Sequence, residues 1–310
     1  MDDNAYQRFL ALVHAAGTEA SAQLDSSDYR ELDQLLAHQV SLPVLDGESW
    51  FSEYTGNLLA IAASAKHVAT NRGTIPAASD LAEAIRTCRI MLGLSRACRN
   101  GGLLVGFFTS LQLEMLALRT IAGLFSAGDP EGNPIASLLD RYERDRESYC
   151  DIARRDLAWS EKAGCASTVL CCSKHAICDG LSGRVDCVGK QLAHSDESVG
   201  HLIPCSHCHD LVLLSLCRLV RVDLMLRQFL EQRKQLPARL QDLDAIESRS
   251  LMDPFTENLF VYHKCTANAF TLYGTGPRVD ARLQQPGTIR QVFEGHGHIA
   301  VGTLFMIDED

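Results

Sequence analysis

The chain has 310 residues, a formal net charge of −10 and a hydrophobic fraction of 46%. This composition is typical of a globular protein with enough residues to bury a full core. A general nucleic-acid binder needs a basic surface, and docking on anionic lipid needs one too, so the acidic balance disfavours both. We therefore expect a folded protein that does not bind nucleic acid.

Amphipathic helices are predicted throughout the first 160 residues. Apolar residues recur there at helical spacing, in segments separated by Gly, Pro, Ser and Asp. Ser26 can cap the second helix, and Ser79 can cap a later one that runs toward Cys98. Short connections imply antiparallel neighbours, and no motif recurs at a fixed period. The pattern predicts a helical domain at 1–163, built as an irregular bundle or solenoid.

The most apolar stretch of the chain, 101–125, could be mistaken for a membrane span. It contains Gln112, Glu114 and Arg119. A charge near the middle of a span costs roughly 3 kcal/mol on insertion scales. We therefore expect a buried helix at this place.

A charge-rich helix is predicted to begin near Pro134 and to continue to Arg155. Three acidic residues alternate there with three arginines: Arg141, Glu143, Arg144, Asp145, Arg146 and Glu147. Alternating signs are typical of a solvated helix face. We interpret these carboxylates as surface groups and not as a catalytic pair.

A Cys- and Gly-rich insert is predicted at 164–208, where helical periodicity fails. The chain has 12 cysteines, and the insert holds many of them, between Cys165 and Cys208. An irregular segment of this length is unusual in a compact domain unless something ties it down or it is functional. Any cofactor of this protein is therefore expected here.

The cysteines of the insert admit several chemistries. Cys205 and Cys208, followed by His209, match the C-x-x-C-H attachment pattern of c-type haem, with His209 as the iron ligand. Zinc is the competing hypothesis, because His175, Cys178, Cys205 and Cys208 supply the four nitrogen and sulfur ligands of a structural site. Disulfides, free thiols and a redox-active Cys205–Cys208 pair stay open as well.

The remainder of the chain, 209–310, predicts a long helix followed by a small antiparallel hairpin. Helical periodicity returns at about Asp210 and ends at Pro237. Two alternating runs around Tyr262 and Leu272 then indicate half-buried strands. The connecting turn is expected at 264–268.

Turn residues flank this hairpin on both sides. Asp253 and Pro254 suit a turn in which the Asp side chain binds nearby backbone. Gly274 and Gly276 would supply positive φ at a sharp exit from the second strand. The predicted fold class is accordingly α+β.

The segment from about Leu213 to Asp280 resembles the globular part of type II secretion major pseudopilins. The resemblance is carried by Leu236-Pro237, by Asp253-Pro254-Phe255 and by Phe270-Thr-Leu-Tyr-Gly-Thr-Gly-Pro277. The whole chain also looks like uncharacterised bacterial envelope proteins with a helical domain before such a hairpin. A pseudopilin assembles through an apolar N-terminal helix that this sequence does not contain, so assembly into a pseudopilus is not implied.

These patterns favour a non-catalytic scaffold or protein-interaction protein of the bacterial cell envelope. The alternative is a metal- or haem-dependent redox protein centred on Cys205, Cys208 and His209. Gly-x-Ser-x-Gly, P-loop and G-x-G-x-x-G motifs are missing from the sequence. The resemblance implies an extracytoplasmic protein, attached to a membrane only if an anchor precedes Met1, or a cytoplasmic one if Met1 is the true start.

Overall fold

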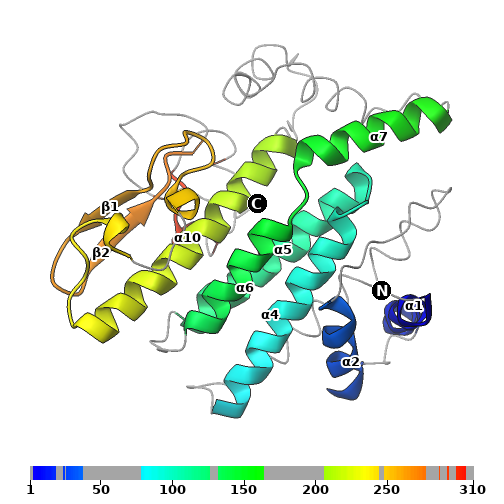
Figure 1. Cartoon of the computed structure of the whole chain (residues 1–310), viewed down its shortest axis with the longest axis horizontal. Helices are drawn as coiled ribbons and strands as arrows, with labels where there is room; N and C mark the ends of the chain where they lie inside the picture. Colours follow the sequence, from blue (N-terminus) through cyan, green and yellow to red (C-terminus); the bar gives the residue numbers. More distant parts are fainter. Residues whose placement is uncertain are drawn as a thin grey trace, which may run out of the picture. The chain divides into compact units, whose positions relative to one another are not determined.

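The computed structural model describes residues 3–18, 24, 26–37, 78–125, 132–163, 206–243, 248–276, 286, 292 and 298–304. The fold is α+β, with a helical bundle and a small two-stranded antiparallel sheet (Figure 1). The chain divides into two compact units. Unit 1 comprises Met1–Ala127 with Arg144–Asp156, and unit 2 comprises Gly128–Glu143 with Leu157–Asp310. The predicted boundaries at 163 and 208 stay predictions.

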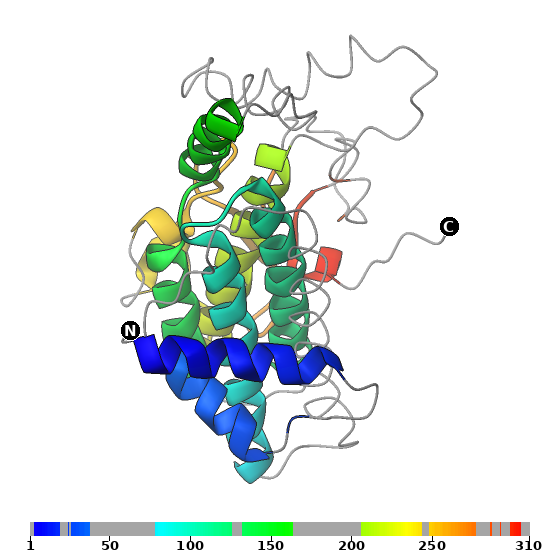
Figure 2. The same cartoon turned by 90° about the vertical axis from the view of Figure 1, so that its right-hand side faces the viewer.

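Unit 1 is helical in all its longer described segments. Its helices are α1 (Asp3–Thr18), α2 (Ser26–Leu36), α4 (Ala78–Arg99), α5 (Leu104–Phe125) and the first half of α7 (Tyr149–Ala163). Helix α1 packs on α2, and α4 packs on both α2 and α5 (Figure 2). Because α4 begins at Ala78, the predicted cap Ser79 lies inside its first turn.

Helices α2 and α4 approach closely at a glycine. A Cβ on Gly93 would lie 2.9 Å from the Cβ of Leu36, which is closer than real side chains come. Leu36 and the neighbouring α4 residues Leu92 and Leu94 are buried. The missing side chain therefore sets the spacing of the two helices.

The apolar stretch predicted to be a buried helix is α5, and that prediction is confirmed. Leu113, Leu118 and Ile121 are fully buried, and so is the polar Glu114. No helix within the described residues is both long enough and apolar enough to cross a membrane.

The charge-rich helix predicted to continue to Arg155 is instead two helices. Helix α6 covers Gly132–Asp145, residues 146–148 are not helical, and α7 begins at Tyr149. The backbone N–H groups of Asp151 and Ile152 both donate to the Ser148 carbonyl, 3.2 Å away, and so start a new turn. The prediction was wrong because the chain bends where alternating charges had suggested a continuous face.

Unit 2 is organised around α10 (Ser206–Arg233), its longest described helix. Val212, Leu216, Leu219, Val222 and Leu226 are fully buried along it. The short helices η3 (Ser248–Leu251) and η4 (Val301–Leu304) and the strand β2 pack against α10. The helix ends four residues before Pro237, and its exit is marked by Lys234 with φ of 58°.

The antiparallel hairpin follows the prediction. Strand β1 (Val261–Lys264) pairs with β2 (Phe270–Tyr273), with Tyr262 opposite Leu272. Cys265 N–H donates to Ala269 O across the turn, at 2.8 Å. The short helix η2 (Leu240–Asp242) lies in the connection from α10 to β1.

Of the two glycines expected to have positive φ, Gly276 does, with φ of 72°. Gly274 does not: it pairs in an antiparallel bridge with Ile299. A Cβ on Gly274 would lie 3.0 Å from Asp253 Oδ2 and 3.1 Å from Ser215 Oγ. Glycine suits this position because neighbouring side chains leave little room for a Cβ, and not because of its backbone angle.

Candidate functional site

The predicted metal and haem ligands fall mostly outside the described residues. This applies to His175, Cys178 and Cys205. Cys208 and His209 lie in the first turn of α10, and His209 is half-buried. Among the described residues, no group of three His, Cys, Asp or Glu side chains is placed to hold a metal. The zinc, haem and disulfide hypotheses stay predictions.

Two cysteines that the structure does describe are unsuited to redox chemistry. Cys88 and Cys98 lie on α4 and are buried. Burial raises the pKa of each thiol to about 12, because a thiolate there would lose its hydration. Both thiols are therefore neutral near pH 7 and are poor nucleophiles.

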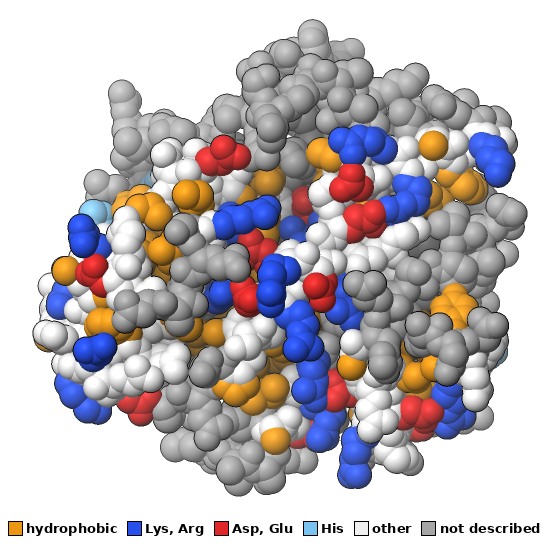
Figure 3. Space-filling model, in the orientation of Figure 1, with side chains coloured by type: hydrophobic (Ala, Val, Ile, Leu, Met, Phe, Trp, Pro, Cys, Tyr) orange, Lys and Arg blue, Asp and Glu red, His pale blue; other side chains and the backbone are white. Residues whose placement is uncertain are grey.

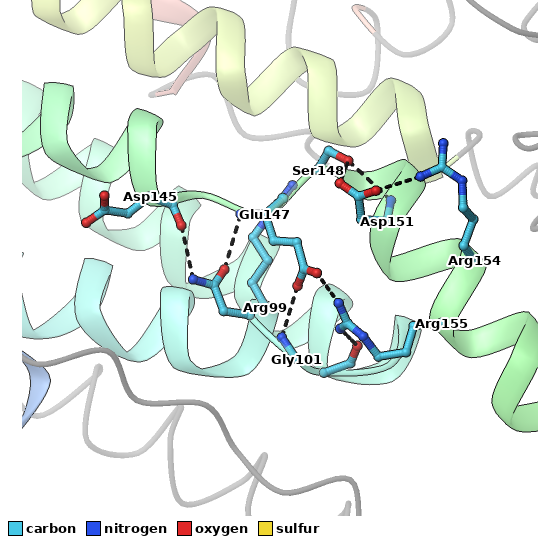
Figure 4. Close-up of polar contacts among 10 residues, drawn as sticks. Arg99, Gly101, Asp145, Glu147, Ser148, Asp151, Arg154 and Arg155 are labelled. Atoms are coloured by element: carbon cyan, nitrogen blue, oxygen red, sulfur yellow. Dashed lines mark hydrogen bonds and ion pairs between the residues drawn. The ribbon is translucent and has the colours of Figure 1, made fainter. Parts of the chain in front are cut away.

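The polar cluster drawn in Figure 4 joins the α4–α5 turn to the link between α6 and α7. We call it the linker clasp; it comprises Arg99, Asn100, Gly101, Gly102, Glu147 and Arg155. Asn100 Nδ2 donates to Asp145 O at 3.0 Å, and Glu147 N–H donates back to Asn100 Oδ1 at 3.2 Å. The Asn100 amide therefore binds the backbone between α6 and α7, at Asp145 and at Glu147, through both of its polar atoms.

Within the linker clasp, Glu147 is bound by three other members: Arg99, Gly101 and Arg155. Arg99 Nε donates to its carbonyl oxygen at 2.6 Å, and Gly101 N–H donates to its Oε2 at 2.9 Å. Arg155 pairs with its other carboxylate oxygen and also donates to Gly102 O at 2.6 Å. The tight turn requires glycine, because Gly101 has φ of 77° and a Cβ on Gly102 would overlap Cys98 O.

A fully buried carboxylate lies beside the linker clasp. Glu114 and Arg99 are both 0% exposed, and Arg146 is 5% exposed. Arg146 Nη2 lies 2.9 Å from Glu114 Oε2, and Arg99 Nη1 lies 3.9 Å from the same oxygen. The Arg99 guanidinium also stands 5.0 Å from the centre of the Phe107 ring. Two cations share one buried anion, so removing the anion would take this charge partner from both guanidinium groups.

A neighbouring arginine of α4 holds two further segments of unit 1. Arg96 donates to Leu36 O at the end of α2, and it pairs with Asp145 at 3.2 Å. A guanidinium suits this task because its several N–H donors point in fixed directions. Helix α4 thus contacts α2 through a charged side chain as well as apolar ones. The same arginine also binds Asp145, where α6 ends.

The interpretation of 141–147 as a solvated helix face is wrong for four of its six charged residues. Asp145, Arg146 and Glu147 are bonded inside unit 1 as described above, and Glu143 is bonded inside unit 2. Only Arg141 and Arg144 of this run are exposed. Alternating charge in a sequence says nothing about partners supplied by other helices, which is why the pattern misled.

One residue of this region could have been found from the sequence. Ser148 Oγ accepts a hydrogen bond from Asp151 N–H at 3.2 Å and donates to Asp151 Oδ2 at 2.6 Å. A serine followed three residues later by an acidic residue is a capping signal at the start of a helix. Ser148-x-x-Asp151 therefore marks the start of α7 within the charge run.

In unit 2, two arginines of α10 also bind segments that are distant in sequence. Arg218 Nη2 lies 2.7 Å from Glu143 Oε1, and its Nη1 donates to Met252 O at 2.8 Å. Arg221 lies 2.7 Å from Asp140 and donates to Ser250 Oγ at 2.7 Å. Both arginines are buried. They join α6 and the η3 region to the same helix.

Asp253 closes the hairpin from its base. It is 1% exposed, and its Oδ1 accepts from Phe255 N–H at 3.0 Å. Its Oδ2 accepts from Thr275 N–H at 2.8 Å and from Thr275 Oγ1 at 3.2 Å. Burial raises the pKa of this carboxyl, and the hydrogen bonds from Phe255, Thr275 and Gly276 oppose the rise. We call Asp253 with Thr275 the hairpin clasp.

These arrangements bind chain segments to one another. General acid–base catalysis requires a carboxyl within reach of a substrate proton, and the carboxyls of Glu114 and Asp253 are buried. Asp253 accepts from backbone N–H groups and from the Thr275 hydroxyl, and Glu114 Oε2 accepts from Arg146, whereas Glu114 Oε1 has no hydrogen-bond partner among the described residues. No protein-family model, curated protein or solved structure matches the chain.

Proposed function

We propose that this chain is a non-catalytic scaffold that binds a protein partner in the bacterial cell envelope. The observation that carries the proposal is the use of its buried charges. Arg99, Arg218 and Asp253 each bind main-chain atoms of a turn that is distant in sequence. Because these three side chains bind main-chain atoms, they hold the turns in place, and we infer that their polar groups do not bind a substrate.

The sequence resemblance supports the location and the type of partner. A long helix, a Leu-Pro segment and an Asp-Pro-Phe turn precede the hairpin in the order expected for a pseudopilin-like module. Tyr262 Oη and Lys264 Nζ donate to the carbonyls of Pro237 and Leu236, at 3.0 and 2.8 Å. The module is thereby a fixed unit, suited to presenting a surface to another protein outside the cytoplasm.

The charge distribution is consistent with a protein partner. Figure 3 shows basic and acidic side chains of the described residues intermingled on one face. Binding to a nucleic-acid backbone relies on clustered positive charge that displaces counterions. A mixed surface favours recognition by complementary charges on another protein.

The absence of a redox cofactor is tested on protein purified from its native host. We expect a visible spectrum without a Soret band. A Soret band together with covalently bound iron would overturn the scaffold proposal and favour haem on Cys205, Cys208 and His209. Elemental analysis distinguishes a second case, since stoichiometric zinc would indicate a structural metal within the same proposal.

The partner is tested by site-specific photo-crosslinking in native cells, followed by fractionation. Leu259 is suitable for the crosslinker because it is 40% exposed beside the Asp-Pro-Phe turn. We expect one discrete adduct in the extracytoplasmic fraction. The matched control carries the crosslinker at exposed Glu231 on α10. Recovery of the chain only from the cytoplasm, without an adduct from either site, would contradict the proposal.

A further inference from the structure

A buried histidine lies where the C-terminal segment of unit 2 meets the end of the hairpin. His298 is 7% exposed, and the centre of its ring lies 4.7 Å from that of Tyr273. Its side chain also forms a hydrogen bond with the Thr275 backbone. The next residue, Ile299, is fully buried. The burial of His298 therefore depends on this segment lying against the end of β2.

Within the described residues, two isolated backbone bridges hold the segment: His298 pairs with Pro286 in a parallel bridge, and Ile299 pairs with Gly274 in an antiparallel one. Gly274 N–H donates to Ile299 O at 2.7 Å, and Ile299 N–H donates to Gly274 O at 3.1 Å. The following short helix, Val301–Leu304, packs against α10. A single antiparallel bridge of this kind has a low free energy of local opening compared with a long ladder. The free-energy cost of a new charge on the adjacent His298 ring is therefore large compared with the free energy of opening this bridge.

Protonation of His298 opposes docking. Burial lowers the pKa of the imidazole below its ordinary value of 6.5, and the hydrogen bond to Thr275 partly offsets this. A histidine whose folded-state pKa is depressed contributes stability that is present above the unfolded value. That stability is lost as the pH falls through the folded-state pKa.

The other titratable and charged groups around Thr275 do not produce the same response. Asp253 is bonded to the N–H and Oγ1 of Thr275, and burial raises its pKa. Its contribution is present below 3.8 and is lost as the pH rises through its folded-state pKa, which is the opposite sense. Tyr273 faces His298 by its ring, and Arg218 of α10 is already paired with Glu143. Among the groups that the structure describes around Thr275, loss of docking on acidification is therefore expected from His298 alone.

We propose that His298 makes the docking of segment 298–304 sensitive to acid, so that protonation of its imidazole releases the segment from Gly274. Release uncovers the backbone groups of Gly274 at the end of β2, together with the α10 surface beneath Val301–Leu304. This property does not rest on the proposed function. It would hold equally in a scaffold or in a cofactor-binding protein.

The test measures hydrogen-exchange protection of single backbone amides in the full chain, from about pH 7.5 to about pH 5.5, where histidines titrate. Protection at Gly274 and Ile299 should fall as the pH drops below 6.5, by up to about tenfold at pH 5.5. Phe260 N–H, which donates to Leu251 O at 2.9 Å within the hairpin base, serves as the internal control. Its protection factor should not change.

The variant His298→Gln keeps a donor for Thr275 but cannot ionise in this range. We expect its Gly274 and Ile299 protection factors to be independent of pH, whereas the control His263→Gln, at an exposed position of β1, keeps the loss. Unchanged protection in the native chain, or the same loss in His298→Gln, would overturn the proposal. A direct NMR titration of His298 in the native chain needs no variant, and a midpoint at or above 6.5 would overturn it as well.

Discussion

Asp253 and Thr275 are 22 residues apart in sequence and are joined by two hydrogen bonds to one carboxylate oxygen, of 2.8 and 3.2 Å. The first of these residues opens the Asp-Pro-Phe turn, and the second follows β2. The pair therefore closes the hairpin at its base, opposite the turn at 265–269. This relationship is the basis of the first prediction.

Asp253→Ala should lower the free energy of unfolding by about 2–4 kcal/mol, because it leaves the N–H groups of buried Phe255 and half-buried Thr275 without this acceptor. Urea unfolding followed by circular dichroism measures the change. The control Asp223→Ala removes a surface pair with Arg227 and should cost about 0.5 kcal/mol or less. Equal effects from the two variants would show that the hairpin clasp does not hold the fold.

Glu114→Gln tests the buried charge beside the linker clasp. It leaves Arg99 and Arg146 without their shared anion, so we expect a loss of about 3–5 kcal/mol. Thermal unfolding is the measurement. The matched control is Glu31→Gln, which breaks the exposed pair with Arg8 and should leave the unfolding temperature unchanged. A Glu114→Gln variant as stable as the native chain would argue against the ion-pair geometry.

Ser148→Ala tests the start of α7. Loss of the capping hydroxyl should reduce stability by about 1 kcal/mol. Ser137→Ala, on an exposed position of α6, removes a hydroxyl without a capping role and should change stability little. If α6 and α7 were one continuous helix, both substitutions would be neutral or slightly stabilising, since alanine favours a helix interior.

Gly274→Ala tests the close packing at the end of β2. The added methyl group would press on Asp253, Ser215 and Phe260, so we expect a loss of about 1–3 kcal/mol in stability. Gly123→Ala is the matched control, because a Cβ there meets nothing within 4 Å and lies on α5. Alanine should stabilise that helix by up to about 1 kcal/mol. The two substitutions should thus have opposite signs, and a stabilised Gly274→Ala variant would contradict the packing.

Much of the fold could be predicted from local patterns. The buried helix at α5, the long helix α10, the hairpin and the positive φ of Gly276 all depend on periodicity or on turn chemistry within a few residues. The predicted site could not be checked in the same way, since His175, Cys178 and Cys205 lie outside the described residues. The break before α7 could have been predicted from Ser148-x-x-Asp151, a local signal that the charge pattern obscured.

The sequence by itself determined the elements, because helix and strand periods and the torsional limits of proline and glycine act over short distances. Only the tertiary structure decided the roles of the charged and small residues. Glu114 lies among buried arginines, Glu147 is held by a turn 46 residues earlier, and Gly274 is crowded by Asp253. Each role depends on a partner brought close by packing, and the spacing of charges along a chain carries no information about such a partner.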